Sequence, residues 1–188
     1  MTEKQRNSEE KRHSRDLERH LEITDVLKKI KTDYSMDPAL EEELYPLIER
    51  IDRSYIPINE LPGKRILDLG AGSTSYSGDS ATPREYEPWL SRALYELGAQ
   101  PVAVDIGDLS QEKFEHHKVD LSKPGALNFM PSESFDGIII RGLITSPLLQ
   151  RMLDKPGIER MKQEFLEQTK RLLKPGGKEI FKERWWKF

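Results

Sequence analysis

The chain contains no cysteine, and this absence excludes disulfide bonds, thiolate catalysis and metal sites built on cysteine. Histidine is also scarce. The four histidines are His13, His20, His116 and His117, and no two have the helical spacing that would let them chelate one metal ion. His116 and His117 are adjacent, so on a strand their side chains would point to opposite faces. The sequence therefore predicts no metal site.

Long apolar runs are also missing. The longest, residues 138–140, stops at Arg141 and is far shorter than the ~20 residues needed to cross a bilayer. The N-terminal residues lack the apolar region of a signal peptide. With 30 basic and 33 acidic residues the net charge is −3, so nothing indicates a general attraction to nucleic acid. These absences predict a soluble, cytoplasmic protein with no membrane partner.

Charged and apolar residues are unevenly distributed in the first third of the chain. Residues 1–16 contain no aliphatic side chain after Met1, and we expect a flexible charged tail. Residues 17–59 carry apolar residues at helical spacing, and they are expected to form a helical cap. Its second helix should begin at Asp37 and break or kink near Pro46. Such a cap can pack on the main domain or act as a lid over a ligand site, and both roles stay open.

From residue 60 to residue 188, short apolar strands alternate with helices. One helix is expected to start at a capping box at Thr82 and to stop at Gly98. Another should run from about Ile158 to Leu172 and end at the turn 174–177. The expected strands are residues 65–69, 101–106, 117–121, 135–141 and 178–182. This alternation predicts an α/β fold: a doubly wound, mostly parallel sheet of about five strands, with an N-terminal helical extension.

Three acidic residues lie at the ends of the first three expected strands. Asp68 precedes a turn that contains Gly70 and Gly72, while Asp105 and Asp120 end the next two strands. Glycines after a parallel strand let the backbone approach a ligand closely, although a tight turn needs them for structural reasons too. Because consecutive strands tend to be neighbours, the three acids should line the edge where open α/β sheets bind ligands.

These motifs resemble the class I S-adenosylmethionine-dependent methyltransferases. Residues 67–72 resemble the family's first motif, in which an acid precedes the glycines. Residues 102–106 resemble the second motif, whose acid holds the ribose, and residues 119–121 resemble the region that faces the adenine amino group. Residues 135–140 resemble the family's fourth strand. Residues 172–177 resemble the end of the helix that precedes its fifth strand. The acid at Asp68 also argues against a nicotinamide-binding Rossmann domain.

The resemblance implies S-adenosylmethionine as the cofactor. Asp68 and the glycine-turn backbone would hold its methionine end, and Asp105 would hold the ribose. The adenine would lie between two apolar side chains, with its amino group at Asp120. Arg141 could contact the cofactor or an anionic substrate, or it could neutralise Asp68 or Asp105. The implied cofactor-binding residues are Asp68, Gly70, Ala71, Gly72, Asp105, Ile106, Asp120, Leu121 and Arg141.

The sequence departs from the family pattern at several places. Thr74 stands where the family has its third glycine, and Asp105 lies further beyond the glycines than the ~20 residues of a simple βαβ unit. The extra length falls in the polar segment 75–81. The family's sheet continues into sixth and seventh strands, whereas this sequence ends at Phe188. No catalytic base can be identified from the sequence, and the family's amino-methylating signature after the fourth strand is absent.

Two hypotheses from different classes therefore remain in front. The first is a methyltransferase that acts mainly by positioning an unidentified acceptor against the methyl group. The alternative is a non-catalytic, methyltransferase-like module that acts through a protein partner; a nicotinamide-dependent oxidoreductase is a distant third. Residues 178–183 are polar enough to predict an edge strand. The aromatic residues after them could fold back onto this domain or dock on a second subunit or another protein, and we favour a homodimer or a protein partner at this C-terminal edge.

Overall fold

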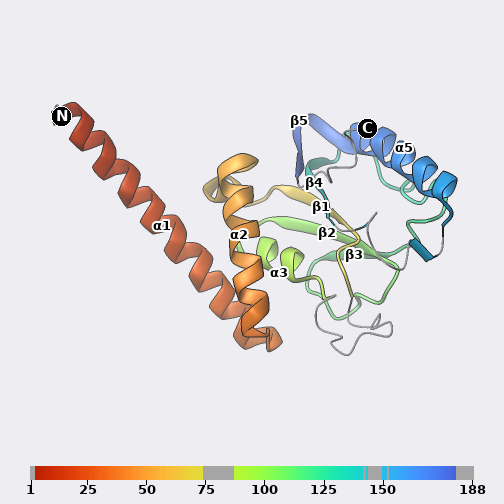
Figure 1. The fold of residues 1–188 in the computed structure, drawn as a ribbon, viewed down its shortest axis with the longest axis horizontal. Helices are drawn as coiled ribbons and strands as arrows, with labels where there is room; N and C mark the ends of the chain where they lie inside the picture. Colours follow the sequence, from red (N-terminus) through yellow and green to blue (C-terminus); the bar gives the residue numbers. More distant parts are fainter. Residues whose placement is uncertain (1–2, 74–86, 142, 144–149, 152, 181–188) are drawn as a thin grey trace.

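The fold is built on a five-stranded sheet in the order β3-β2-β1-β4-β5, in which every neighbouring pair is parallel (Figure 1). The computed structural model describes residues 3–73, 87–141, 143, 150–151 and 153–180. The order reverses between β1 and β4, as it does in Rossmann-like folds. The expected doubly wound α/β fold is therefore confirmed. The strands are β1 (Arg65–Leu69), β2 (Gln100–Asp105), β3 (Glu115–Lys118), β4 (Phe135–Ile140) and β5 (Leu173–Ile180).

Successive side chains of a strand point to opposite faces of the sheet, and helices bury both faces of the central strands. On one face, Ile66 and Ile139 pack with α1 (Glu3–Tyr34), α2 (Pro38–Ser54) and α3 (Trp89–Glu96). On the other face, Leu67 and Ile138 pack with α5 (Lys155–Leu172). A short 3-10 helix, η1 (Ile58–Glu60), leads into β1. Among the described helices, none combines the length and apolar character needed to cross a membrane.

From Ile23 onward, the N-terminal cap belongs to the core of the domain. Ile23, Leu27 and Ile30 of α1 and Ile48 of α2 are at most 1% exposed. Asp37 caps α2 by accepting the N–H of Ala39 at 2.8 Å, as expected. At least in its core-facing part, the cap thus has the packing role that the sequence left open.

The expected break near Pro46 does not occur, since α2 continues from Pro38 to Ser54. Pro46 removes one helical hydrogen bond, the one to the carbonyl of Glu42. Both residues are exposed, so water can bind the carbonyl that loses its partner. The proline therefore stays inside the helix at a tolerable cost.

The first half of α1 extends away from the sheet (Figure 1). The helix continues from Glu3 without a break at residue 17, where the sequence predicts the change from tail to cap. Its first apolar side chains, Leu17 and Leu21, are more than half exposed. The division into residues 1–16, 17–59 and 60–188 stays a prediction.

Several expected boundaries shift. The predicted capping box at Thr82 lies outside the described residues, but α3 itself begins at Trp89 because Pro88 constrains the residue before it away from helical geometry. β3 ends at Lys118, before Asp120. β5 begins at Leu173, so the predicted turn at residues 174–177 is part of this strand, with a register shift opposite residues 135–137. Within the described part of the chain β5 pairs only with β4, as the edge prediction for its C-terminal half requires.

Candidate functional site

The chain leaving β1 turns over the carboxyl end of β2. The amides of Gly70 and Ala71 both donate to the carbonyl of Val104, at 2.8 and 3.2 Å. Gly70 and Gly72 have φ angles of +71° and +93°, which side chains with a Cβ rarely adopt. The two predicted glycines therefore have a backbone reason to be glycine. Neither glycine places a side chain at this edge of the sheet, and Ala71 between them adds only a methyl group.

Asp105 holds this turn in place. Its Oδ2 accepts the N–H of Gly72 at 3.0 Å, and its Oδ1 accepts the N–H of Gly107 at 2.9 Å. A carboxylate has about four lone-pair positions, so about two remain for other donors. The half-buried Ile106 follows directly. The structure thus brings Asp105 and Ile106 to the glycine turn, as the sequence predicts.

Asp68 lies beneath the turn, on the face of the sheet that α3 covers. Its side chain is almost fully buried, and its Oδ2 accepts the hydroxyl proton of Ser91 at 2.7 Å. Burial raises the pKa of Asp68 from its ordinary value of 3.8 to about 6. The Ser91 hydrogen bond and the positive charge of Arg141 oppose this rise in pKa, while the negative charge of Asp105 adds to it.

Ser91 is a site residue that sequence reasoning missed. It is 0% exposed and lies on α3 among the buried side chains Leu90, Ala93 and Leu94. A small hydroxyl residue inside an apolar helix face was the available signal, because a buried hydroxyl needs a partner. The identity of that partner, Asp68, depends on how α3 packs on β1.

Arg141 follows β4 directly, and its side chain is exposed. The preceding residue, Ile140, pairs with Leu69 of β1. This pairing places the start of the segment after β4 beside the glycine turn. A Cβ at Gly70 would lie only 3.0 Å from Cδ1 of Leu143. The effect of Arg141 on the pKa of Asp68 supports the neutralising role among those left open.

Asp120 and Leu121 come after the end of β3. The N–H of Val119 donates to the carbonyl of Asp105 at 2.7 Å, which brings this segment beside β2. Asp120 accepts the N–H and the hydroxyl of Ser122, at 3.0 and 2.5 Å. Leu121 is buried in the core on the α5 side of the sheet. Both residues lie near the expected edge, and their contact with an adenine ring stays a prediction.

Ser73 is a further residue of interest at the end of the glycine turn. Its side chain is 1% exposed, and its Oγ has no hydrogen-bond partner. A buried hydroxyl without a partner is unfavourable unless a ligand or water binds it. Thr74, the polar segment 75–81 and the aromatic residues after Glu183 lie outside the described residues.

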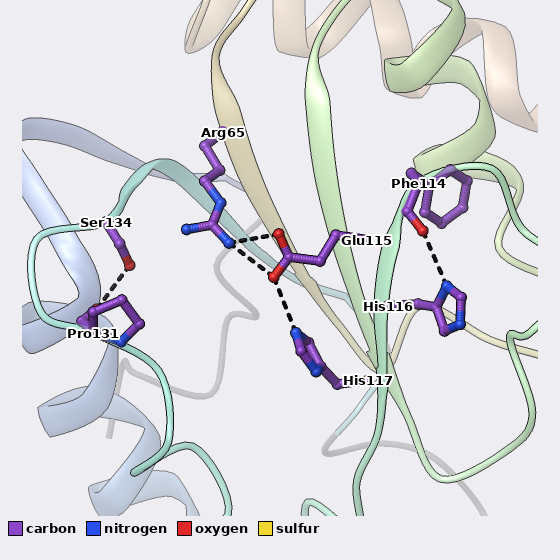
Figure 2. Close-up of polar contacts among 7 residues, drawn as sticks. All are labelled: Arg65, Phe114, Glu115, His116, His117, Pro131 and Ser134. Carbon is purple, nitrogen blue, oxygen red and sulfur yellow. Dashed lines mark hydrogen bonds and ion pairs between the residues drawn. The ribbon is translucent and has the colours of Figure 1, made fainter.

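The histidines of β3 lie on opposite sides of the strand, as expected (Figure 2). Nε2 of His117 contacts Oε1 of Glu115 at 3.0 Å, and Nδ1 of His116 contacts the carbonyl of Phe114 at 3.0 Å. Glu115 in turn accepts two hydrogen bonds from Arg65, at 2.8 and 2.6 Å. Both imidazoles thus contact residues toward the amino end of β3. No cluster of side chains in the described part of the chain is arranged to hold a metal ion.

No protein-family model and no curated protein matches the sequence. Two solved methyltransferases are similar in structure. The CurJ carbon methyltransferase is 17% identical over 72% of this chain and 32% of that chain, with a TM-score of 0.38. The trans-methyltransferase CalH, solved in complex with SAH, is 16% identical over 86% of this chain and 52% of that chain, with a TM-score of 0.39. The chain thus spans about a third and about half of these two proteins. Its Rossmann-like fold rests on the strand order and pairing described above.

Proposed function

We propose that the protein is a methyltransferase that binds S-adenosylmethionine over the carboxyl ends of β1 and β2. One arrangement carries this proposal. Asp68 lies buried next to the turn in which Gly70 and Gly72 carry no side chain, and Asp105 holds that turn while keeping acceptor positions for a ligand. A carboxylate on each of two adjacent strand ends suits a ligand with an ammonium group at one end and ribose hydroxyls at the other.

The described residues fit such a ligand. The unpartnered Ser73 hydroxyl and the exposed Arg141 guanidinium can bind a carboxylate, and Asp68 can accept from an ammonium group. Asp105 can accept from ribose hydroxyls, and the segment at Asp120 can meet the base. When bound, the sulfonium supplies an already activated methyl group. The contribution of the chain is then to orient that group and to exclude water.

The alternative, a binding module that transfers no methyl group, is favoured by a different observation. Both histidines of β3 contact residues toward the amino end of the strand, and neither of these contacts is with a residue of the proposed site. Asp68 is the described acid whose pKa is raised toward neutrality, but it lies beneath the turn and bonds Ser91. Under this alternative the protein acts through a partner, for which the C-terminal edge stays our predicted location.

Calorimetric titration with S-adenosylmethionine, S-adenosylhomocysteine and NAD tests the proposal. We expect saturable binding of the first two ligands and none of NAD. Binding of NAD alone would contradict it and restore the oxidoreductase hypothesis. Release of S-adenosylhomocysteine with a panel of acceptors would then separate the enzyme from the binding module. The cytoplasmic location stays a prediction, and the acceptor is unidentified.

A further inference from the structure

Arg92 is a buried cation beside the site. Its side chain is 4% exposed and lies on α3 directly after Ser91. Nε and Nη2 donate to the two carboxylate oxygens of Glu112 at 3.1 and 2.6 Å, and Nη1 donates to Glu87 at 2.5 Å. The Glu112 side chain is itself only 2% exposed. A guanidinium and two carboxylates thus lie together inside the domain. None of the three belongs to the site residues predicted from the sequence.

Two aromatic rings complete the surroundings of Arg92. Its guanidinium carbon lies 4.1 Å from the ring centroid of Tyr34 and 4.6 Å from that of Trp89. Both distances are in the range of cation–π interactions. We call Tyr34, Glu87, Trp89, Arg92 and Glu112 the Arg92 cluster. The cluster joins the last residue of α1, the segment before α3, α3 itself and the loop between β2 and β3.

The cluster depends on all its charged members being present together. Burial alone would lower the pKa of Arg92, but its hydrogen bonds to Glu112 and Glu87 raise it, so the guanidinium stays charged. A buried charge that loses a partner is strongly unfavourable, whereas a complete ion pair adds little to stability compared with apolar side chains. Such a group is therefore better suited to fixing one arrangement than to stabilising the domain.

The arrangement that it fixes includes a site residue. Ser91 and Arg92 are consecutive in the first turns of α3, and the Ser91 hydroxyl lies 2.7 Å from Asp68. A displacement of this part of α3 would therefore move the hydroxyl away from the carboxylate. Tyr34 brings the C-terminal end of the cap to the same guanidinium. The cap thus has a physical connection to the proposed cofactor site.

We infer that Arg92 is a positioning residue, which couples the N-terminal cap, through Tyr34, to cofactor binding at Asp68 by holding Ser91. This inference rests on the proposed function. It predicts that cofactor affinity falls when the cluster is altered, because Ser91 is displaced from Asp68.

Calorimetric titration with S-adenosylhomocysteine tests the inference in the full chain. Arg92→Lys keeps the charge but loses the planar fork, and we expect affinity to fall on the order of tenfold. Tyr34→Leu should lower affinity about three-fold or more, while Tyr34→Phe keeps the ring and should bind as the unaltered protein does. Lys31→Met is the control, because Lys31 also ties α1 to a neighbouring helix, through the partly exposed Glu41 of α2, and is not a member of the cluster. Its affinity should not change.

A double-mutant cycle separates positioning from general damage to the fold. If Arg92 acts through Ser91, then Arg92→Lys should cause little further loss of affinity in a Ser91→Ala background. Equal losses in both backgrounds would overturn the inference, as would an unchanged affinity of the Arg92→Lys single variant. If Arg92→Lys does not fold, Arg92→Met with Glu112→Gln removes the buried charge and its main partner together, and the same cycle applies.

The outcome also distinguishes this inference from the proposed function. If the unaltered protein does not bind S-adenosylhomocysteine, the proposed function fails, and the inference about cofactor binding fails with it. If the unaltered protein binds and all variants bind equally well, the proposed function stands and the inference alone is wrong. Circular dichroism of each variant confirms that the compared proteins are folded.

Discussion

Asp68 and Asp136 lie on neighbouring parallel strands but near opposite ends of the sheet. Asp136, near the start of β4, accepts the N–H of Arg65 at 2.9 Å and the ammonium of Lys174 at 2.7 Å. Partial burial would raise its pKa, but these contacts and the charge of Lys64 lower it overall. Asp68, near the end of β1, has its pKa raised to about 6 by burial, which Ser91 and Arg141 offset only in part.

The comparison separates two uses of a carboxylate in one sheet. Asp136 is surrounded by donors and cations, so its ionised form is favoured and it ties β1 to β4 and β5. Asp68 is buried where its ionised form is disfavoured. An apolar side chain at this position would avoid the free-energy cost of burying a carboxyl group. A residue held in an unfavourable charge state is a mark of a functional site. Under the proposed function, the two ends of the sheet serve stability and binding respectively.

The largest effect is expected at Asp105, on the binding side of the comparison. Asp105→Ala should lose two charge-assisted hydrogen bonds to the ligand, at a cost of ~2–4 kcal/mol in binding. That cost corresponds to a rise in Kd of ~30-fold or more for S-adenosylhomocysteine. Asp105→Asn, which keeps one acceptor oxygen, should lose less. A folded Asp105→Ala protein with unchanged affinity in calorimetry would contradict the ribose assignment.

The next effect is the pH dependence of stability that Asp68 causes. Its pKa is 3.8 ordinarily and about 6 in the folded protein, so the folded state binds this proton more tightly than the unfolded state. The free energy of unfolding should therefore fall as the pH rises from about 4 to 6, and this contribution should level off above that range. At 1.36 kcal/mol per pKa unit the total is about 3 kcal/mol.

Urea unfolding at several pH values measures this contribution as the difference between the unaltered protein and Asp68→Asn. The two should diverge between pH 4 and 6. Asp136→Asn should show the opposite sign, because the lowered pKa of Asp136 makes its stabilising effect disappear as the pH falls. Parallel curves for the unaltered protein and Asp68→Asn would mean that Asp68 is not held in the disfavoured state.

A smaller effect on stability is expected from Asp136→Ala. This change leaves the N–H of Arg65 without its acceptor and separates two partly exposed lysines from their counter-charge. The free energy of unfolding should fall by about 1–3 kcal/mol, mostly because of the N–H group, since exposed ion pairs contribute little. Affinity for S-adenosylhomocysteine should stay the same. A loss of affinity would erase the distinction between the two ends of the sheet.

The smallest effect concerns hydrogen exchange within α1. The last turn of the helix meets Arg92 through Tyr34. Arg19 and His20, in the segment 17–23, instead contact Asp52 and Tyr45 of α2 and lie far along the helix from Tyr34. Binding of S-adenosylhomocysteine should slow exchange in the last turn by a few-fold and leave residues 17–23 unchanged. If exchange along the whole helix is the same with and without the ligand, the cap serves packing only.

Much of the fold could be predicted because its signals are local. Short apolar runs separated by glycine and proline turns marked β1, β2 and β4 almost to the residue. Asp37 with Pro38 marked the start of α2. The glycine turn and the acids at the carboxyl ends of β1 and β2 also followed from the sequence, since residues at these ends of neighbouring parallel strands must share one edge.

Other features could not be read in this way because they depend on contacts between distant residues. α2 continues through Pro46 because Leu44 and Ile48, on either side of the proline, pack into the same core. β5 starts early because Leu173 pairs with Phe135. Leu121 turns into the core on the α5 side, a direction that its position after a strand does not specify. In each case tertiary packing outweighs a weak local preference.

By itself, the sequence determined a doubly wound α/β sheet, its glycine turn and the order of its acids, because strand periodicity and turn chemistry act over a few residues. Only the tertiary structure decided the state of those acids. Asp68 meets Ser91, and Arg92 meets Tyr34 and Glu112, only after α3 packs between the cap and the sheet. Burial, which sets the pKa of a carboxylate and the need of an arginine for its partners, belongs to the packed molecule and to no single segment of it.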